Sequence, residues 1–521
     1  MNAESAYLFR HALLRDAAYQ LQLPGDRARL HALAFGAIEA LAGGRAPRPS
    51  PLDAAEPAPF APHPTDAFAQ ELAIHARFAN SGGPSGPGAA DPRDAAGLLE
   101  LYVQRAAEVA EKKFLHSTAQ ELWLQLAELS QEALRGAALV RAGSAASTRG
   151  RPQEAERLYQ EATELFRSIA ARRLEAGALS DLAGVEMQTG RTAQAELTLE
   201  QALGILREVG DRRGEGKALS NLANLSRQTG RVEQAERIYG EALAVHRETR
   251  DRRIEAVAMG NLAGLYLETG RGDLAGRTWE KSLAIHREVG DRRGEGIALG
   301  GLAILSSTTG RVEQAERLFE QALAIHGEVG DRQDEGIARG NLAQLYRETG
   351  RIEQAGRLLE DSLAIRREAG DRRGEGIALG NLAAGFFESG LAERAEQAWE
   401  QALSIHREVG NRRSEGVALG NLAGLFLKSG RAEQAGRTLE RALEIHGQVG
   451  NKHFEGAHNC DYALCLVALG RRSEGAEAWR KGMGILRSVN DDKQAERKRS
   501  AMQVACSRAG VPPFEEESGR A

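Results

Sequence analysis

The sequence is poor in the features that mark secreted and membrane proteins. It has only three cysteines among 521 residues, Cys460, Cys465 and Cys506, and no two of them form a CxxC pair. This excludes a disulfide framework and predicts a reducing compartment. No apolar run approaches the roughly 18–20 residues that span a bilayer. The first apolar stretch contains Arg10 and His11, unlike a secretion signal. We therefore expect a cytoplasmic protein without a membrane partner.

Features of nucleotide-binding, nucleic-acid-binding and catalytic proteins are also missing. The net charge is −5 with 27% charged residues, a mixed surface that argues against nucleic acid as the main partner. A P-loop is excluded because Gly216-Lys217 is followed by Ala218, where Ser or Thr is needed. No Ser/His/Asp or Cys/His arrangement stands out, and the carboxylates usually stand beside arginines on helix surfaces. We expect neither a cofactor nor enzymatic activity.

One phrase recurs along the chain. GDRRGEGIALGNLA begins at Gly370, and close copies begin at Gly210, Gly290, Gly330 and Asn411. The copies lie 40 residues apart when they are aligned on their NLA or GLA ending. A phosphate-binding loop occurs once per nucleotide site, whereas a phrase repeated at a fixed period is a structural module. A chain of 521 residues is also too long for one compact core, so a repeat array is expected.

Each 40-residue unit is predicted to form two helices. In one unit Asp371 can cap the first helix and Gly390 can end it. Ile377 and the leucines after it recur at helical spacing and are expected on its apolar face. Between residues 93 and 511 the only proline is Pro152, near a helix start where proline is tolerated. The stop glycine recurs at Gly190, Gly230, Gly270, Gly310, Gly350, Gly430 and Gly470.

Small and large residues alternate in a pattern that resembles the tetratricopeptide (TPR) motif, L-G/A-x2-Y followed by A-x3-F-x2-A. A near-complete match is formed by Leu262-Ala263, Tyr266, Ala275, Trp279 and Ser282. The 40-residue variety looks like the repeats of Pins-type spindle-orientation adaptors and is similar to those of kinesin light chains. The resemblance covers about residues 131–490. It implies an all-α fold of about ten helical hairpins in a right-handed TPR superhelix, and a non-catalytic scaffold for a protein or peptide ligand.

Three further regions lie outside these repeats. Residues 43–93, which contain most of the prolines, are predicted to be a Pro/Gly/Ala-rich linker with a short helix near 71–79. Residues 94–130 are predicted to form a degenerate helical hairpin. Residues 491–521 are expected to be a polar capping helix with a tail, because the last unit of a solenoid needs a polar outer face.

Residues 1–42 are predicted to be helical with a break at Pro24. The phrase FRHALLRDAAYQLQLPGDRARLHALA, followed by ELAIHA, resembles the region after the ATPase core in STAND-type predicted ATPases. No P-loop or Walker-B-like run accompanies it in this chain. The resemblance implies an alternative function, namely the regulatory or sensor arm of a bacterial signal-transduction ATPase, or a linked cyclase or kinase. The catalytic part of such a protein is missing from this chain, and association with an ATPase is possible under this alternative.

Histidines near the end of the second helix suggest a metal site at first sight. Equivalent positions in successive hairpins are about one helix-packing distance apart, roughly 8–10 Å, which is too far for one ion. Cys460 and Cys465 lie near His453 and His458, but their spacing fits no familiar zinc pattern. We expect polar and small packing positions rather than metal ligands. The recurring histidines are His246, His286, His326, His406 and His446.

An asparagine precedes the Leu-Ala pair in most first helices. Asparagine is a mediocre helix former, so its return needs a reason. The amide can bond to a neighbouring helix, or recent duplication has copied it. Alternatively, first helices line a concave groove where a ladder of amides binds the backbone of an extended peptide. The resemblance implies this role, because Pins-type adaptors and kinesin light chains use matching asparagines in this way. The ladder comprises Asn221, Asn261, Asn341, Asn381 and Asn421.

Other residues are expected in the same groove. The positions just before the ladder, Gly300, Gly380 and Gly420, are expected to leave room for the ligand's main chain. Both explanations of the ladder stay open, and the sequence names no partner and no oligomeric state. Helical spacing adds as groove candidates Asn224, Arg227, Gln344, Arg347 and Lys428.

Overall fold

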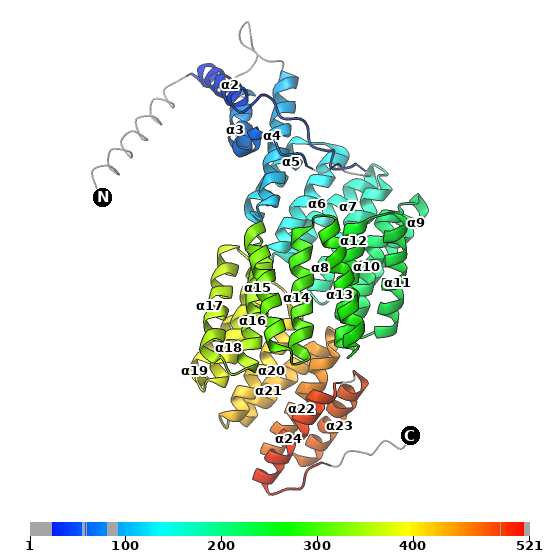
Figure 1. The fold of residues 1–521 in the computed structure, drawn as a ribbon, viewed down its shortest axis with the longest axis vertical. Coiled ribbons are helices and arrows are strands. Elements are labelled where there is room, and N and C mark those ends of the chain that lie inside the picture. The colour runs from blue at the N-terminus through cyan, green and yellow to red at the C-terminus, as the bar shows by residue number, and fades with distance from the viewer. Residues whose placement is uncertain (1–22, 55–57, 59, 81–91, 490, 515–521) are drawn as a thin grey trace, which may run out of the picture. The chain divides into compact units, whose positions relative to one another are not determined.

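The computed structural model describes residues 23–54, 58, 60–80, 92–489 and 491–514. These residues form 23 α-helices and one 3-10 helix and contain no strand, which confirms the predicted all-α class (Figure 1). The chain divides into two compact units, residues 1–145 with 164–170 and residues 146–163 with 171–521. The helix predicted before Pro24 lies outside the described residues. No helix in the described ranges is long and apolar enough to cross a membrane.

In the first unit a buried arginine holds part of the proline-rich stretch against a helix. Arg105, whose side chain is 1% exposed, lies 2.7 Å from Asp66. It also donates to the carbonyls of Pro47 at 2.8 Å and Ala61 at 3.0 Å. The short helix predicted near 71–79 lies within α3. The elements of this region are α2 (Pro24–Leu41), η1 (Pro64–Phe68), α3 (Ala69–Asn80), α4 (Pro92–Lys112) and α5 (His116–Leu129).

The helices that follow alternate as first and second members of hairpins. Contacts join α4 to α5 and, from α8/α9 to α22/α23, each first helix to the second helix that follows it. The first helices are α6 (Glu132–Thr148), α8 (Arg172–Gln188), α10 (Arg212–Gln228), α12 (Arg252–Glu268), α14 (Arg292–Thr308), α16 (Arg332–Glu348), α18 (Arg372–Glu388), α20 (Arg412–Lys428) and α22 (Lys452–Ala468). The second helices are α7 (Pro152–Ser168), α9 (Thr192–Val209), α11 (Val232–Glu248), α13 (Gly272–Glu288), α15 (Val312–Val329), α17 (Ile352–Glu368), α19 (Ala392–Glu408), α21 (Ala432–Gln448) and α23 (Arg472–Ser488). A last helix, α24 (Asp492–Ala509), packs Met502 and Cys506 against α22 and α23.

The repeated phrase encodes the start of each first helix. The Asp371 carboxylate accepts from the backbone N–H of Gly374 at 2.8 Å and caps α18 as predicted. Gly390 ends the helix with φ +77°, a left-handed conformation that favours glycine. The second arginine of the phrase joins successive first helices, because Arg213 of α10 lies 2.7 Å from the cap Asp251 of α12.

The first arginine and the glutamate of the phrase tie three helices together. Glu375 of α18 lies 2.7 Å from Arg367 of α17 and 2.7 Å from Arg372. Arg372 also lies 2.7 Å from Glu408 of α19. Burial opposes ionisation of Glu375, but its bonds to the two arginines outweigh burial and lower its pKa. A glutamate held by two arginines recurs as Glu215, Glu255, Glu295 and Glu415.

The second glycine of the phrase makes room for a buried histidine. A Cβ built on Gly376 would lie 2.8 Å from Cε1 of His406, whose ring belongs to a residue only 2% exposed. In the unit where Ala256 replaces this glycine, His286 instead lies 3.0 Å from the cap Asp291. The recurring histidines are therefore packing residues at the ends of second helices.

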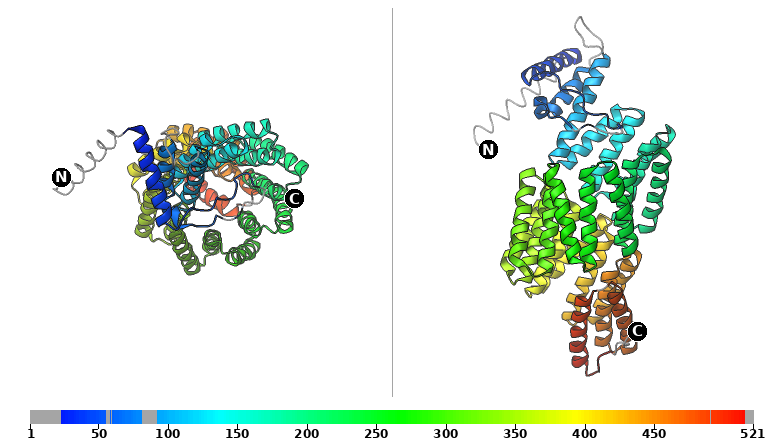
Figure 2. Two further views of the ribbon diagram at one scale, coloured as in Figure 1. Left: turned by 90° about the horizontal axis from the view of Figure 1, so that it is seen from above. Right: turned by 45° about the vertical axis from the view of Figure 1, so that its right-hand side comes forward.

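First helices lie on the inner side of the curved array. Successive first helices from α8 to α22 contact one another, whereas no comparable contact joins successive second helices in the described part of the chain. In an array of hairpins the layer with the shorter path brings its helices closer together. The second unit accordingly curves with its first helices on the inside, and the view from above in Figure 2 shows its helices arranged along a curve.

The second unit also contacts itself across one turn of the superhelix. A Cβ built on Gly190, at the end of α8, would lie 2.7 Å from Val449 and 3.5 Å from the Cβ of Arg412. One hairpin further on, Arg413 Nη1 donates to the carbonyl of Gln228 at 3.2 Å. Negative carboxyl ends of α8 and α10 thus meet arginines at the amino ends of later first helices, which is a favourable arrangement of helix dipoles and charge.

A change in the caps accompanies this contact. Arg213 and its equivalents Arg253 and Arg293 pair with the aspartate that caps the next first helix. Where Arg373 and Arg413 would find that aspartate, the chain has Asn411 and Asn451. Arg373 and Arg413 therefore lack the aspartate with which their equivalents pair. Both lie at the turn-to-turn contact, Arg373 with its backbone N near Gly150 and Arg413 with its side chain at Gln228.

We expect the double substitution Arg373→Ala and Arg413→Ala to loosen the turn-to-turn contact without unfolding the hairpins. The radius of gyration in small-angle X-ray scattering should increase. Amides near residue 150, which faces Arg373, and near residue 228, which faces Arg413, should exchange faster with deuterium. Arg357→Ala is the control, because Arg357 is exposed on α17. Unchanged scattering and exchange in the double variant would contradict this prediction.

We expect acid to destabilise the fold through the buried histidines. Burial lowers the pKa of His406 to about 4 and those of His446 and His458 to about 3, whereas an unfolded histidine titrates near 6.5. Below that pH the unfolded chain binds more protons, so the free energy of unfolding falls by about 1.4 kcal/mol per pH unit for each histidine. Urea unfolding at pH 7, 6 and 5 should show this loss, and His406→Gln should flatten it. An unchanged slope in that variant would count against the prediction.

Candidate functional site

The first helices from α10 to α20 each keep one stripe of side chains open to solvent. In α18 the exposed residues Ile377, Asn381 and Glu388 are separated by four and seven positions and share one face of the helix. Leu379 and Ala383 lie on other faces and are buried. Because first helices are on the inner side of the array, these stripes together form its inner face.

The five ladder asparagines all lie on this inner face. Asn221, Asn261 and Asn341 are half-buried, and Asn381 and Asn421 are exposed. Within the described ranges no hydrogen bond from another residue reaches any of the five side-chain amides. An amide that is unpaired and open to solvent is available to bind a ligand's backbone.

The five additional groove candidates are engaged within the protein. Arg227 lies 2.9 Å from Glu268. Arg347 donates to Glu388 at 2.9 Å and to Gln344 at 2.9 Å. The remaining contacts are Asn224 Oδ1 with the Tyr239 hydroxyl at 2.5 Å and Lys428 Nζ over the Phe387 ring at 4.3 Å. These residues border the inner face as paired groups, so a ligand would have to compete for them.

Two expectations about individual positions were wrong. Ile377 was expected on the apolar core face of its helix, but it is 38% exposed, because Leu379 is two residues away and points to another side. Gly420 was expected to leave room for a ligand, but a Cβ there would lie 1.9 Å from the ring of His458, which fills that space. At Gly300 and Gly380 a Cβ would meet nothing within 4 Å, so these two positions are open.

Sequence reasoning missed a row of exposed aliphatic side chains beside the ladder. Val257, Ile297, Ile337 and Ile377 are 46%, 53%, 43% and 38% exposed. Each stands one helical turn before the ladder position of its own helix. The signal was present in the sequence, because an aliphatic residue four positions before the ladder shares its face, and that face had already been assigned to solvent or ligand.

One group of side chains has a geometry that could hold a metal ion. Ligand atoms of His326, Asp331 and Asp334 lie within 4.8 Å of one another. However, Arg293 lies 2.6 Å from Asp331 and 3.0 Å from Asp334, so an arginine already supplies the positive charge. Burial raises the pKa of Asp334 to about 6. The group is best described as a charged junction between α14 and α16.

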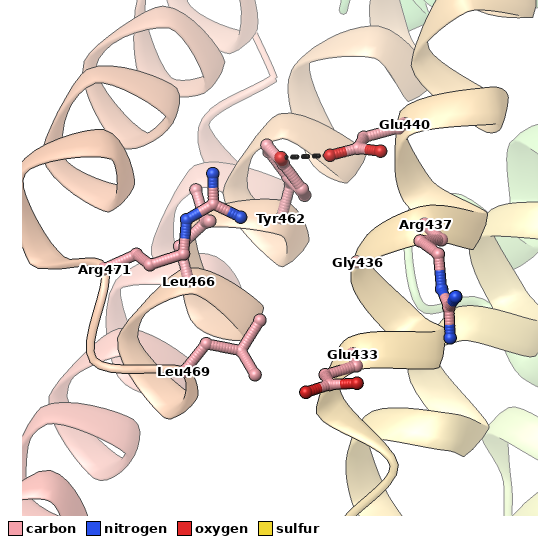
Figure 3. Close-up of a pocket in the computed structure, with 8 residues that line it drawn as sticks. All are labelled: Glu433, Gly436, Arg437, Glu440, Tyr462, Leu466, Leu469 and Arg471. Atoms are coloured by element: carbon pink, nitrogen blue, oxygen red, sulfur yellow. Dashed lines mark hydrogen bonds between the residues drawn. The ribbon is translucent and has the colours of Figure 1, made fainter.

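A cavity of about 410 Å³ lies where α21 meets α22 and the start of α23 (Figure 3). In the preceding hairpin Glu396 and Arg431 form an ion pair at 2.8 Å across the corresponding junction. Gly436 replaces that glutamate here, and Arg471 pairs with Glu474 of its own helix instead. The cavity is therefore a gap left by a missing side chain. Its lining includes Tyr462, Glu440, Leu466 and Leu469, with the Tyr462 hydroxyl donating to Glu440 at 2.6 Å.

Comparison with known proteins identifies the repeats. The tetratricopeptide repeat family model matches residues 174–248, 254–328, 308–368, 334–408 and 374–448, which together cover more than half of the chain. This confirms the predicted identity of the repeats. The matches do not reach the N-terminal region, so its resemblance to STAND-type ATPases stays a prediction. No curated protein matches the chain.

Several solved structures share the repeat architecture. A Rap protein complexed with Competence and Sporulation Factor is 14% identical, with a TM-score of 0.49, over 73% of this chain and 99% of that chain. Nearly identical TPR-like repeats of a protein described as a kinesin light chain from Podosopora anserina are 22% identical, with a TM-score of 0.30, over 36% and 93%. BtubC (BKLC) from P. vanneervenii is 23% identical, with a TM-score of 0.33, over 49% and 96%. Identities and scores this low carry no information about a shared ligand.

We expect the ladder asparagines to contribute little to stability. Asn341→Ala removes no hydrogen bond of the described protein and introduces a better helix former. The free energy of unfolding, measured by thermal denaturation, should therefore change by a few tenths of a kcal/mol at most. Asn224→Ala is the matched comparison, because it leaves the buried Tyr239 hydroxyl without this acceptor and should cost about 1–3 kcal/mol. A large loss of stability in the Asn341 variant would instead support a structural role for the ladder.

Proposed function

Because this chain belongs to the tetratricopeptide repeat family, we propose that it is a non-catalytic scaffold that binds an extended segment of a partner protein along its inner face. The observation that carries this proposal is the row of unpaired amides, one on each of five first helices, on the open side of the array. The partner is a protein or peptide, and we place its binding in the cytoplasm, where three buried free cysteines would stay reduced.

The chemistry of the amide row suits an extended main chain. Every peptide unit of an extended ligand has an N–H donor and a C=O acceptor that need partners once water is removed. A side-chain amide offers both functions from one residue, so the same residue type can serve whichever backbone group faces it. Open positions at Gly300 and Gly380, where a Cβ would meet nothing within 4 Å, leave space for a close approach of the ligand.

The charged groups of the array have structural partners, which supports a binding role rather than catalysis. Buried carboxylates such as Glu375 and Glu415 are each held by two arginines. The buried histidines are packed against glycines or caps, and burial lowers the pKa values of His406 and His446. An ion pair between structural partners lowers the pKa of a carboxylate and makes it a poor general base at neutral pH.

Loss of the ladder amides should weaken partner binding without unfolding the protein. Affinity purification followed by mass spectrometry supplies the partner, whose affinity is then measured by calorimetry. The triple variant Asn341→Ala, Asn381→Ala, Asn421→Ala should bind at least tenfold more weakly, because each lost amide leaves a buried peptide group of the ligand unpaired at a cost of about 1–3 kcal/mol.

The control for this experiment is Gln401→Ala, since Gln401 is an exposed amide on the second helix α19 and not on the inner face. Its affinity should equal that of the unmodified protein. Unchanged affinity in a folded triple variant would contradict the proposal and would indicate a binding surface on the outer face.

A further inference from the structure

The aliphatic row on the inner face consists of Val257, Ile297, Ile337 and Ile377, one from each of four successive first helices. Their exposed fractions lie between 38% and 53%. The row is flanked at one end by Lys217 in the equivalent position and at the other by the half-buried Val417. Four neighbouring units thus present large apolar side chains to solvent on the same side of the array.

The fold itself does not require these side chains. β-branched residues are weaker helix formers than Lys, Ala or Leu, because their χ1 rotamers are restricted against the preceding turn. Lys217 occupies the same position in α10, so the helix forms and packs without an aliphatic residue there. Exposed apolar side chains that recur at one position on four successive helices are not scattered singly, and such grouping is typical of a surface that a partner covers.

The surroundings of the row indicate what covers it. Unpaired ladder amides stand one helical turn away on three of these four helices, after Val257, Ile337 and Ile377, whereas Gly301 takes the place of the amide after Ile297. A covering group must therefore bring backbone donors and acceptors together with apolar side chains. The row also lies on the inner side of a curved array, which a narrow, extended segment reaches more readily than the flat face of a folded domain. An extended segment of a partner therefore fits better than a second copy of this chain.

We propose that the inner face selects extended segments that carry an aliphatic side chain at about every third residue. Successive first helices are in contact, and packed helices are separated by roughly 8–10 Å. A polyproline-II chain advances about 3.1 Å per residue with three residues per turn, so side chains three residues apart point to one side at about this interval. Its backbone makes no internal hydrogen bonds and is free to bind the amides. This inference rests on the proposed function and specifies its ligand.

The test uses two synthetic 15-residue peptides of identical composition and the full-length protein. One peptide has leucine at every third position in a Ser/Gln background, and the other has the same number of leucines in one block at its end. Fluorescence anisotropy should show at least tenfold tighter binding of the first peptide. The double variant Ile297→Ser and Ile337→Ser should lose at least tenfold of that affinity, because the contact area of two aliphatic side chains is removed.

Ile352→Ser is the matched control, because Ile352 is 37% exposed but begins the second helix α17. It should leave the affinity unchanged. Equal affinity for the two peptides, no binding of either, or full affinity in the Ile297/Ile337 variant would each overturn the inference.

The outcomes separate this inference from the proposed function. If the asparagine triple variant loses binding of the natural partner while the isoleucine variant does not, the scaffold role stands and the aliphatic preference is wrong. Sedimentation of the free protein tests the other occupant. A dimer that the isoleucine variant converts to a monomer would show that a second copy covers the row, and would also overturn the inference.

Discussion

A buried glutamate at the start of the first helices from α8 to α22 is the constraint on which the array depends. Each of these glutamates is at most 7% exposed, and a buried carboxylate is tolerated only where it is paired. In the unit of Glu375 the pairing arginines come from the preceding second helix and from the same first helix, and Arg372 continues to the following second helix. One ionic junction therefore fixes three helices, and its repetition gives successive hairpins the same geometry.

Because packing and ionic contacts occupy the other faces of the first helix, its inner stripe has little structural work to perform. The stripe is layered: aliphatic residues such as Ile337 come first, the ladder amides one turn later, and ion pairs such as Arg347 with Glu388 at the far end. This order explains why the amides lack partners although their neighbours are paired. It also means that a ligand would meet apolar, amide and charged chemistry in parallel rows.

The helices, their caps and their stop glycines could be predicted because they depend on local sequence, as at Asp371 and Gly390. The choice of faces was less secure. Ile377 was expected on the core face because it is apolar and recurs with the leucines at roughly helical spacing. Only the packing of neighbouring helices shows which face of the helix stays open to solvent. Two contacts join residues that are far apart in the sequence. The ring of His458 fills the space beside Gly420, and Arg413 donates to Gln228. Such contacts follow from the curvature of the whole array, which the 40-residue phrase does not encode.

The contact between Arg413 and Gln228 has a consequence for how such a chain evolves. Repeat arrays ordinarily gain and lose whole units freely, because each unit contacts only its neighbours. Here the end of α10 contacts the start of α20, so this contact forms only with a fixed number of hairpins between the two helices. A duplication between α10 and α20 would move Arg413 away from the Gln228 carbonyl, whereas a duplication after α22 would preserve this contact. Recombination between the near-identical copies is therefore tolerated after α22 but disrupts a contact when it occurs between α10 and α20. The segment between these two helices is expected to keep a fixed number of hairpins.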